Sequence, residues 1–171
     1  MTVFTIGVYG FSAATFLAEL RRASVPRLLD VRQRRGVRGA EYAWANSRRL
    51  QAALADAGLA YEHRPELAPT TELRELQYAE DARQGVGKRS RRTLAQEYID
   101  RYTGEILDPA DLEPVLAALP AALLCVEGDP GACHRSLITQ RLADEHGVEV
   151  RHLHPRRRPV RGGPVGPSHS W

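Results

Sequence analysis

Short apolar runs alternate with amphipathic segments along the first 154 residues of the chain. Residues 3–6, 28–31, 59–63, 121–126 and 148–153 are the apolar runs, and they predict five strands. The second run carries apolar residues on both faces, which is typical of a buried parallel strand. The segments between the runs repeat apolar residues at helical spacing. The pattern therefore predicts a single-domain, three-layer α/β fold: a mostly parallel, Rossmann-like sheet with helices on both faces.

Capping residues predict where the helices begin and end. Ser12 should cap the first helix, and Phe11 and Phe16 are spaced to form a hydrophobic staple across that cap. A second helix, over residues 40–57, should end at Gly58. Three further helices are expected before the fourth strand, over residues 70–82, over residues 93–102 with an end at Gly104, and from Asp108-Pro109 onward. They predict an enlarged helical connection into the fourth strand.

Residues 121–147 carry the densest set of reactive side chains in the chain. The apolar strand ends near Cys125 and Glu127, a turn follows, and an amphipathic helix should run from Asp129-Pro130 to Gly147. This places Cys133 and His134 in the first helical turn. Free backbone N–H groups and the helix dipole favour an anion or a thiolate there.

Strand-to-helix loops of a parallel sheet all lie at its carboxyl edge, where ligands bind. We therefore expect one pocket at this edge to hold Asp30, Arg32, Glu127, Cys133 and Arg135. Asp30 and Arg32 could equally form a structural ion pair that orders their loop.

Three kinds of cysteine chemistry compete for Cys125 and Cys133. An anion-cradling phosphatase or sulfurtransferase loop is disfavoured by the acids at 127 and 129 and by the missing N–H of Pro130. A zinc site is a weak match, since Cys125, Cys133, His134 and a remote His152 fit no familiar spacing. A nucleophilic or redox thiol at Cys133 needs only proximity. We expect no cofactor and no metal, with Cys125 in the core and Cys133 alone facing the pocket.

Two basic loops are candidates for supplying anion-binding groups. Four arginines, at 32, 34, 35 and 38, crowd the end of the second strand and need an anion or carboxylates to offset their repulsion. Lys88, the single lysine of the chain, begins a second basic run that ends at residue 92. This second run is expected to be a solvated charge run by default. Tyr42 and Trp44 could stack on a base, or could simply pack a helix face.

Charge and composition separate a body from a tail. The net charge is +3 over 171 residues, but the tail 155–171 holds four arginines and no acid, which leaves −1 for residues 1–154. Basicity is therefore no argument that the body binds nucleic acid. We expect an α/β domain over residues 1–154 and a disordered tail rich in Pro, Gly and Arg over 155–171. No apolar stretch is long enough to span a membrane, so we expect a cytoplasmic protein without a membrane partner.

Several short motifs together resemble a known family. They are Thr5-Ile6-Gly7, Asp30-Val31-Arg32, Leu124-Cys125-Val126-Glu127 with Asp129-Pro130, and Cys133-His134-Arg135-Ser136-Leu137. In this combination the chain, over residues 3–154, resembles the bacterial and archaeal domain of unknown function 488 family. Many members follow Thr-Ile-Gly with His-Ser, where this chain has Val8-Tyr9. The resemblance supports the fold and the site, and it implies no substrate.

Two functions are compatible with these residues. The first is an enzyme that uses a thiol or acid/base groups and acts on a phosphate-bearing ligand. This ligand would be a small anionic molecule such as a nucleotide, or a nucleic acid. The second is a non-catalytic module that binds nucleic acid or protein and has structural cysteines. For the enzyme, the candidate catalytic residues are Cys133, His134, Glu127 and Asp30, and the candidate ligand-binding residues are Arg32, Arg35, Arg38, Lys88, Arg135, Tyr9, Tyr42 and Trp44.

Overall fold

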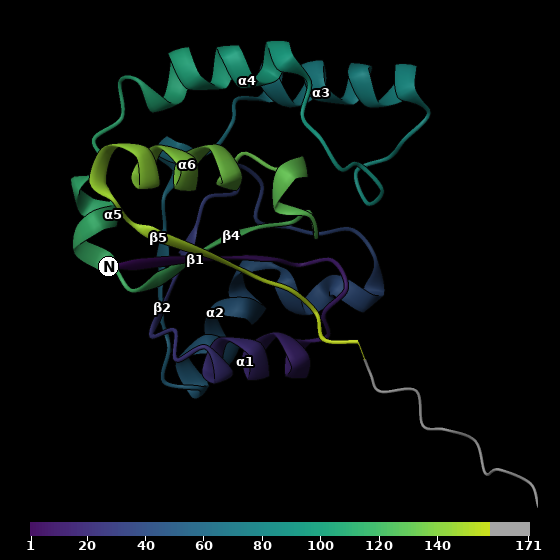
Figure 1. The fold of residues 1–171 in the computed structure, drawn as a ribbon. Coiled ribbons are helices and arrows are strands. Elements are labelled where there is room, and N and C mark those ends of the chain that lie inside the picture. Colours follow the sequence, from purple (N-terminus) through teal and green to yellow (C-terminus); the bar gives the residue numbers. More distant parts are fainter. Residues whose placement is uncertain (158–171) are drawn as a thin grey trace, which may run out of the picture.

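A computed structural model describes residues 1–157, and its centre is a five-stranded sheet (Figure 1). The strands are β1 (Thr2–Gly7), β2 (Arg27–Asp30), β3 (Ala60–His63), β4 (Ala121–Cys125) and β5 (Glu149–Leu153). They lie in the order β3-β2-β4-β1-β5, and every pairing is parallel. The predicted α/β class is confirmed. The expected disorder of the tail falls on residues that, from 158 onward, lie outside the described part of the chain.

Helices cover both faces of this sheet. They are α1 (Ala13–Arg22), α2 (Ser47–Asp56), α3 (Thr71–Gln84), α4 (Gln96–Tyr102), α5 (Glu113–Ala118) and α6 (Arg135–His146). Helices α1 and α2 pack on one face and α3 to α6 on the other (Figure 1). No helix within residues 1–157 has both the length and the hydrophobicity of a membrane-spanning segment.

Strand β4 lies in the middle of the sheet, which explains its unbroken apolar sequence. All five of its residues are buried. Leu123 belongs to the core cluster of α3 to α6, whereas Leu124 belongs to the cluster of α1 and α2. Both faces of the strand therefore need apolar side chains.

The capping signals at two helices are confirmed. The Ser12 hydroxyl accepts from the backbone N–H of Thr15, and the rings of Phe11 and Phe16 meet edge-on at 5.6 Å. Gly147 ends α6 in the left-handed conformation, with φ of 64°.

The helix expected over residues 40–57 is two helices. A 3₁₀ helix, Ala40–Ala45, precedes α2, and Asn46 between them is extended. The Asn46 side chain accepts from the backbone N–H of Val37 at 2.8 Å. An asparagine that bonds to a neighbouring loop in this way competes with continuous helix.

Two other predicted helix limits are wrong. Gly104 does not end a helix, because the chain continues through a π-helical turn, Thr103–Leu107, that buries Leu107. Asp108 does not open one either, since its carboxylate accepts from Arg141 at 2.6 Å and α5 begins only at Glu113.

The topology places a crevice between the carboxyl ends of β2 and β4. The chain leaves β2 toward α2 on one face and leaves β4 toward α6 on the other. Neighbouring strands whose connections diverge in this way leave a ligand-sized gap at the edge of the sheet.

Candidate functional site

A short capped turn carries the chain from β4 into α6. Asp129 accepts from the backbone N–H of Gly131 at 2.8 Å, and Pro130 begins a 3₁₀ turn of three residues. The chain then becomes extended at Cys133, with φ of −140° and ψ of 146°, and α6 begins at Arg135. The prediction that Cys133 and His134 lie in the first helical turn is therefore wrong. Cys133 instead accepts from the backbone N–H of Arg135, at 3.5 Å from its sulfur.

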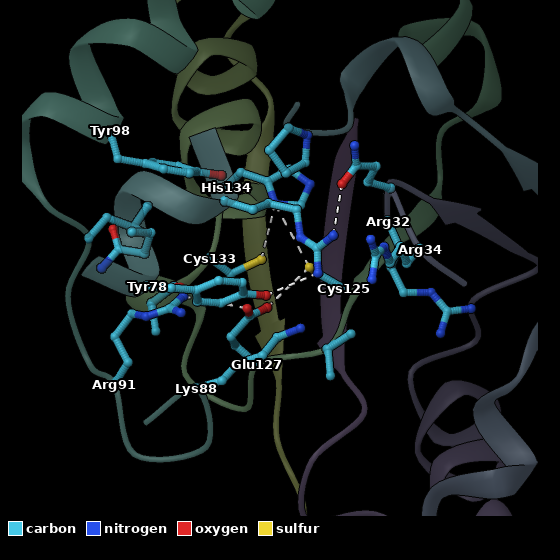
Figure 2. Close-up of a pocket in the computed structure, with 17 residues that line it drawn as sticks. Arg32, Arg34, Tyr78, Lys88, Arg91, Tyr98, Cys125, Glu127, Cys133 and His134 are labelled. Atoms are coloured by element: carbon cyan, nitrogen blue, oxygen red, sulfur yellow. Dashed lines mark hydrogen bonds and ion pairs between the residues drawn. The ribbon is translucent and has the colours of Figure 1, made fainter. Parts of the chain in front are cut away.

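Cys125, Cys133 and His134 converge at one point (Figure 2). His134 Nδ1 lies 3.8 Å from the sulfur of Cys125 and 3.6 Å from that of Cys133, and the three atoms are all within 4.8 Å of one another. Both cysteines are buried, reduced and in the lining of the same cavity. The expectation that Cys125 points away into the core was wrong, because the extended backbone at Cys133 brings its side chain back toward β4.

His134 is held by a single backbone contact. Its Nε2 lies 2.8 Å from the carbonyl oxygen of Val31. A carbonyl only accepts, so Nε2 carries the proton and the Nδ1 lone pair of the neutral ring faces the two sulfurs. Burial lowers the pKa of His134, whereas the Val31 carbonyl, which accepts from Nε2, raises it.

Glu127 is a buried carboxylate beside the thiols. The Cys125 thiol donates to Glu127 Oε2 at 3.2 Å, and Arg91 lies 3.5 Å from Oε1. Burial alone would raise the pKa of Glu127, but Lys88 and other partners hold it below its usual value. Burial, together with Cys133 and Glu127, raises the pKa of Cys125 well above its usual value. The carboxylate is therefore ionised and the Cys125 thiol neutral at pH 7.

The loop after α3 supplies two cations to this cavity, Lys88 and Arg91 (Figure 2). Arg91 is buried, forms a double contact with Asp81 on α3 and donates to the Ala132 carbonyl at 3.0 Å. The expectation of a solvated run over residues 88–92 is thus wrong at Arg91. Burial lowers the pKa of Lys88, but Glu127 raises it more, so the ammonium is charged.

Asp30 and Arg32 form the buried ion pair that was one of the two interpretations of their spacing. Two nitrogens of Arg32 donate to the two oxygens of Asp30 at 2.9 and 2.8 Å. Tyr61 adds a hydroxyl contact to Asp30 at 2.5 Å. Arg32 reaches the cavity lining, but Asp30 does not.

Arg135 lies behind the cavity rather than in it. Its guanidinium donates to the carbonyls of Glu127 at 2.6 Å and Gly128 at 3.3 Å, and the residue has no exposed surface. A Cβ on Gly7 would lie only 2.0 Å from the Glu127 carbonyl oxygen. The Gly in Thr5-Ile6-Gly7 and the Arg in Cys133-His134-Arg135 therefore position the same loop.

Of the five residues expected in one pocket, Arg32, Glu127 and Cys133 line it.

The remaining predicted ligand-binding residues lie outside this cavity lining. Tyr9 and Tyr42 pack together with centroids 5.2 Å apart, and the guanidinium of Arg89 lies 5.2 Å from each ring. Trp44 packs on Phe16 in the core. The side chains of Arg35 and Arg38 do not line the cavity either, and Arg35 contacts the Tyr61 hydroxyl at 3.4 Å.

The contribution of α3 to the cavity was not predicted from the sequence. Leu73, Gln77 and Asp81 are buried at intervals of four, so two polar side chains lie in line with a core leucine. Gln77 binds Asp81 at 2.9 Å and accepts from the backbone N–H of Ala95 at 2.8 Å. The spacing of Gln77 and Asp81 at intervals of four from Leu73 was the available signal. The other unforeseen lining residues include Arg74, Tyr78 and Tyr98, and Arg34 lines the cavity as one of the four arginines of the first basic loop.

The comparisons with known proteins concern the family alone. A family model described as domain of unknown function DUF488 matches residues 12–142. Separate searches of curated proteins and of solved structures found no match.

Proposed function

The chain belongs to the DUF488 family of domains of unknown function, and from this premise we propose that it is an enzyme acting on a phosphate-bearing ligand, a nucleotide or nucleic acid. The reaction takes place in the cavity at the carboxyl edge of the sheet. The observation that carries the proposal is the meeting of two thiols, an imidazole and a carboxylate in a cavity that is also lined by arginines and a lysine.

The charges around the cavity support an anionic ligand. Among residues 1–157, five arginine and lysine side chains line it, against the single carboxylate of Glu127. Two of these cations, Arg32 and Arg91, are already paired with buried aspartates. Within residues 1–157, Arg34, Arg74 and Lys88 form no ion pair within 4 Å. These three can therefore contact an incoming phosphate.

The buried groups support catalysis rather than binding alone. Glu127 is held as a carboxylate, whereas the adjacent Cys125 is held as a thiol. Neighbouring groups whose environments drive their pKa values apart are the usual arrangement of an acid and a base. The cavity volume is about 50 Å³, room for a few water molecules. A substrate places only its reacting group inside, and its bulk lies outside over Arg34 and Arg74.

A binding series tests the anion site. Inorganic phosphate, nucleoside mono- and triphosphates, and short single-stranded DNA and RNA are titrated into the full-length protein by calorimetry. We expect at least one phosphate-bearing ligand to bind, more weakly as salt is raised. Lys88→Ala and Arg34→Ala should each weaken binding by about tenfold or more, because a hydrogen bond to a charged group contributes about 1.5–3 kcal/mol. Arg48→Ala, an exposed arginine on α2 away from the cavity, is the matched control.

Turnover separates the enzyme from the binding module. Bound ligands are incubated with the protein, and products are followed by mass spectrometry. Glu127→Gln should bind the ligand but form no product. If the unmodified protein binds a ligand but forms no product, the non-catalytic module is favoured. If Lys88→Ala and Arg34→Ala leave the ligand affinity unchanged, the proposed anion site is refuted.

A further inference from the structure

We propose that Cys125, Cys133 and His134 together bind one Zn²⁺ ion, with a fourth coordination position open to the cavity. Thiolate and imidazole are the ligands that zinc prefers over the oxygen ligands of magnesium or calcium. The motif spacing in the sequence fits no familiar zinc pattern, yet the fold brings these three side chains together (Figure 2).

The separations of the three atoms match those of a zinc site. With Zn–S of about 2.3 Å and Zn–N of about 2.0–2.1 Å, tetrahedral geometry places sulfur and nitrogen ligands about 3.6 Å apart and two sulfurs about 3.8 Å apart. His134 Nδ1 lies 3.8 and 3.6 Å from the two sulfurs, and the sulfurs lie within 4.8 Å of each other. Binding requires adjustments of no more than about an ångström.

The surroundings of His134 also suit a metal ligand. Histidines that bind zinc usually donate their other ring N–H to a carboxylate or a backbone carbonyl, which fixes the ring and its tautomer. The contact between His134 Nε2 and the Val31 carbonyl at 2.8 Å does this. The Arg135 backbone N–H donates to the Cys133 sulfur at 3.5 Å and so fixes the position of that ligand.

Charge balance permits a buried metal here. Zn²⁺ displaces the thiol proton of Cys125, and two thiolates with one neutral imidazole around the ion then form a neutral unit, so burial costs far less than it would for separate ions. The remaining negative charge, on Glu127, is already offset by Arg91 at 3.5 Å and by Lys88.

The open position indicates a catalytic rather than a structural metal. Structural zinc sites have four protein ligands, whereas catalytic sites have three and leave one position for water. Glu127 lies 3.2 Å from the Cys125 sulfur but outside the three-atom cluster, so it is free to act on that water. Zinc-dependent nucleobase deaminases use the same ligand types with a glutamate that does not bind the metal.

A hydrolytic step follows, and it rests on the proposed function. Glu127 accepts a proton from the metal-bound water. The resulting hydroxide forms a bond to an electrophilic carbon or phosphorus of the substrate. The bond to the leaving group then breaks with its electron pair, and the leaving group takes up the proton held by Glu127. Water is the only co-reactant.

Metal content tests the site directly. Full-length protein is purified without chelators or metal-affinity steps and analysed by plasma mass spectrometry, with one zinc per chain expected. Cys133→Ala and His134→Gln should lower the zinc content at least tenfold, whereas Glu127→Gln should retain it. His146→Gln, an exposed histidine at the end of α6, is the matched control.

Cobalt titration keeps the test independent of variant folding. Metal-free unmodified protein, kept reduced, should develop the absorption of tetrahedral cobalt thiolate, complete at one equivalent and reversed by Zn²⁺. Absence of zinc together with absence of this absorption would overturn the metal site. A Cys125–Cys133 disulfide in protein handled without oxidant would do the same.

Failure of the metal site and failure of the proposed function are distinguishable. If the protein binds zinc but converts no phosphate-bearing ligand, the metal site is supported and the proposed enzymatic function is refuted. If turnover continues after complete removal of the metal, the enzymatic function is supported and the catalytic role of the metal is refuted.

Discussion

Replacing Arg32 with alanine should destabilise the fold strongly, because this side chain neutralises a buried carboxylate. Arg32 donates twice to Asp30, at 2.9 and 2.8 Å, and once to the Ala45 carbonyl at 2.9 Å. The two charged side chains are 1% and 0% exposed. Water therefore cannot replace the guanidinium unless the end of β2 opens.

The expected loss follows from these contacts. Removing one partner of a buried ion pair costs about 3–5 kcal/mol, since the other charge is left uncompensated. Asp30 would keep the Tyr61 hydroxyl and the backbone N–H of residue 32, so we expect the lower end, about 3 kcal/mol. For a chain of 171 residues, this corresponds to a fall in Tm of about 6–12 °C.

Urea unfolding followed by circular dichroism measures this loss. Arg34→Ala is the control, since Arg34 is exposed and two residues away, and its change should stay within about 0.5 kcal/mol. Adding Asp30→Ala to Arg32→Ala should recover part of the stability, because no unpaired charge remains. A loss below about 1 kcal/mol accompanied by weaker ligand binding would refute this reasoning and return Arg32 to the ligand-binding role predicted from sequence.

Three further predictions concern the loop after β4. Gly7→Ala should destabilise the protein by about 1–3 kcal/mol and lower zinc content or turnover, because the Cβ of the new alanine would clash with the Glu127 carbonyl. Gly104→Ala is the control, since a Cβ at position 104 would meet open space. The pKa of Glu127 in the folded protein lies below its ordinary value of 4.5. Ionisation of Glu127 therefore stabilises the fold fully above pH 4.5, and this contribution is lost as the pH falls through the folded-state pKa. The stability difference between the unmodified protein and Glu127→Gln should therefore shrink on acidification, and a difference that is constant from pH 7 to 3 in urea titrations would contradict it. Because the pKa of Cys125 is raised and the residue is buried, iodoacetamide should label it in metal-free protein only after unfolding; rapid labelling of the folded chain at pH 7, seen by mass spectrometry, would disprove this.

Local signals predicted the elements whose causes are local. The apolar runs located all five strands, and Ser12 and Gly147 marked helix ends, since strand burial and capping depend on residues close in sequence. Predictions failed where distant contacts decide. Gly104 stays helical because Leu107 packs into the core, and Asp108 binds Arg141 instead of capping a helix.

The sequence by itself determined the fold class and the sheet edge at which the candidate cavity lies: alternating strands and helices require a layered sheet, and parallel strands present their following loops at one edge. Only the tertiary structure decided which side chains share the cavity. One extended residue at Cys133 turns two cysteines and a histidine toward each other, and packing of α3 brings Arg91 to Glu127 across 36 residues. Arg32 and Arg34 line this cavity, whereas Arg35, Arg38, Tyr42 and Trp44 lie outside its lining. Side-chain direction depends on backbone dihedrals and on neighbours distant in sequence, and no spacing rule encodes either.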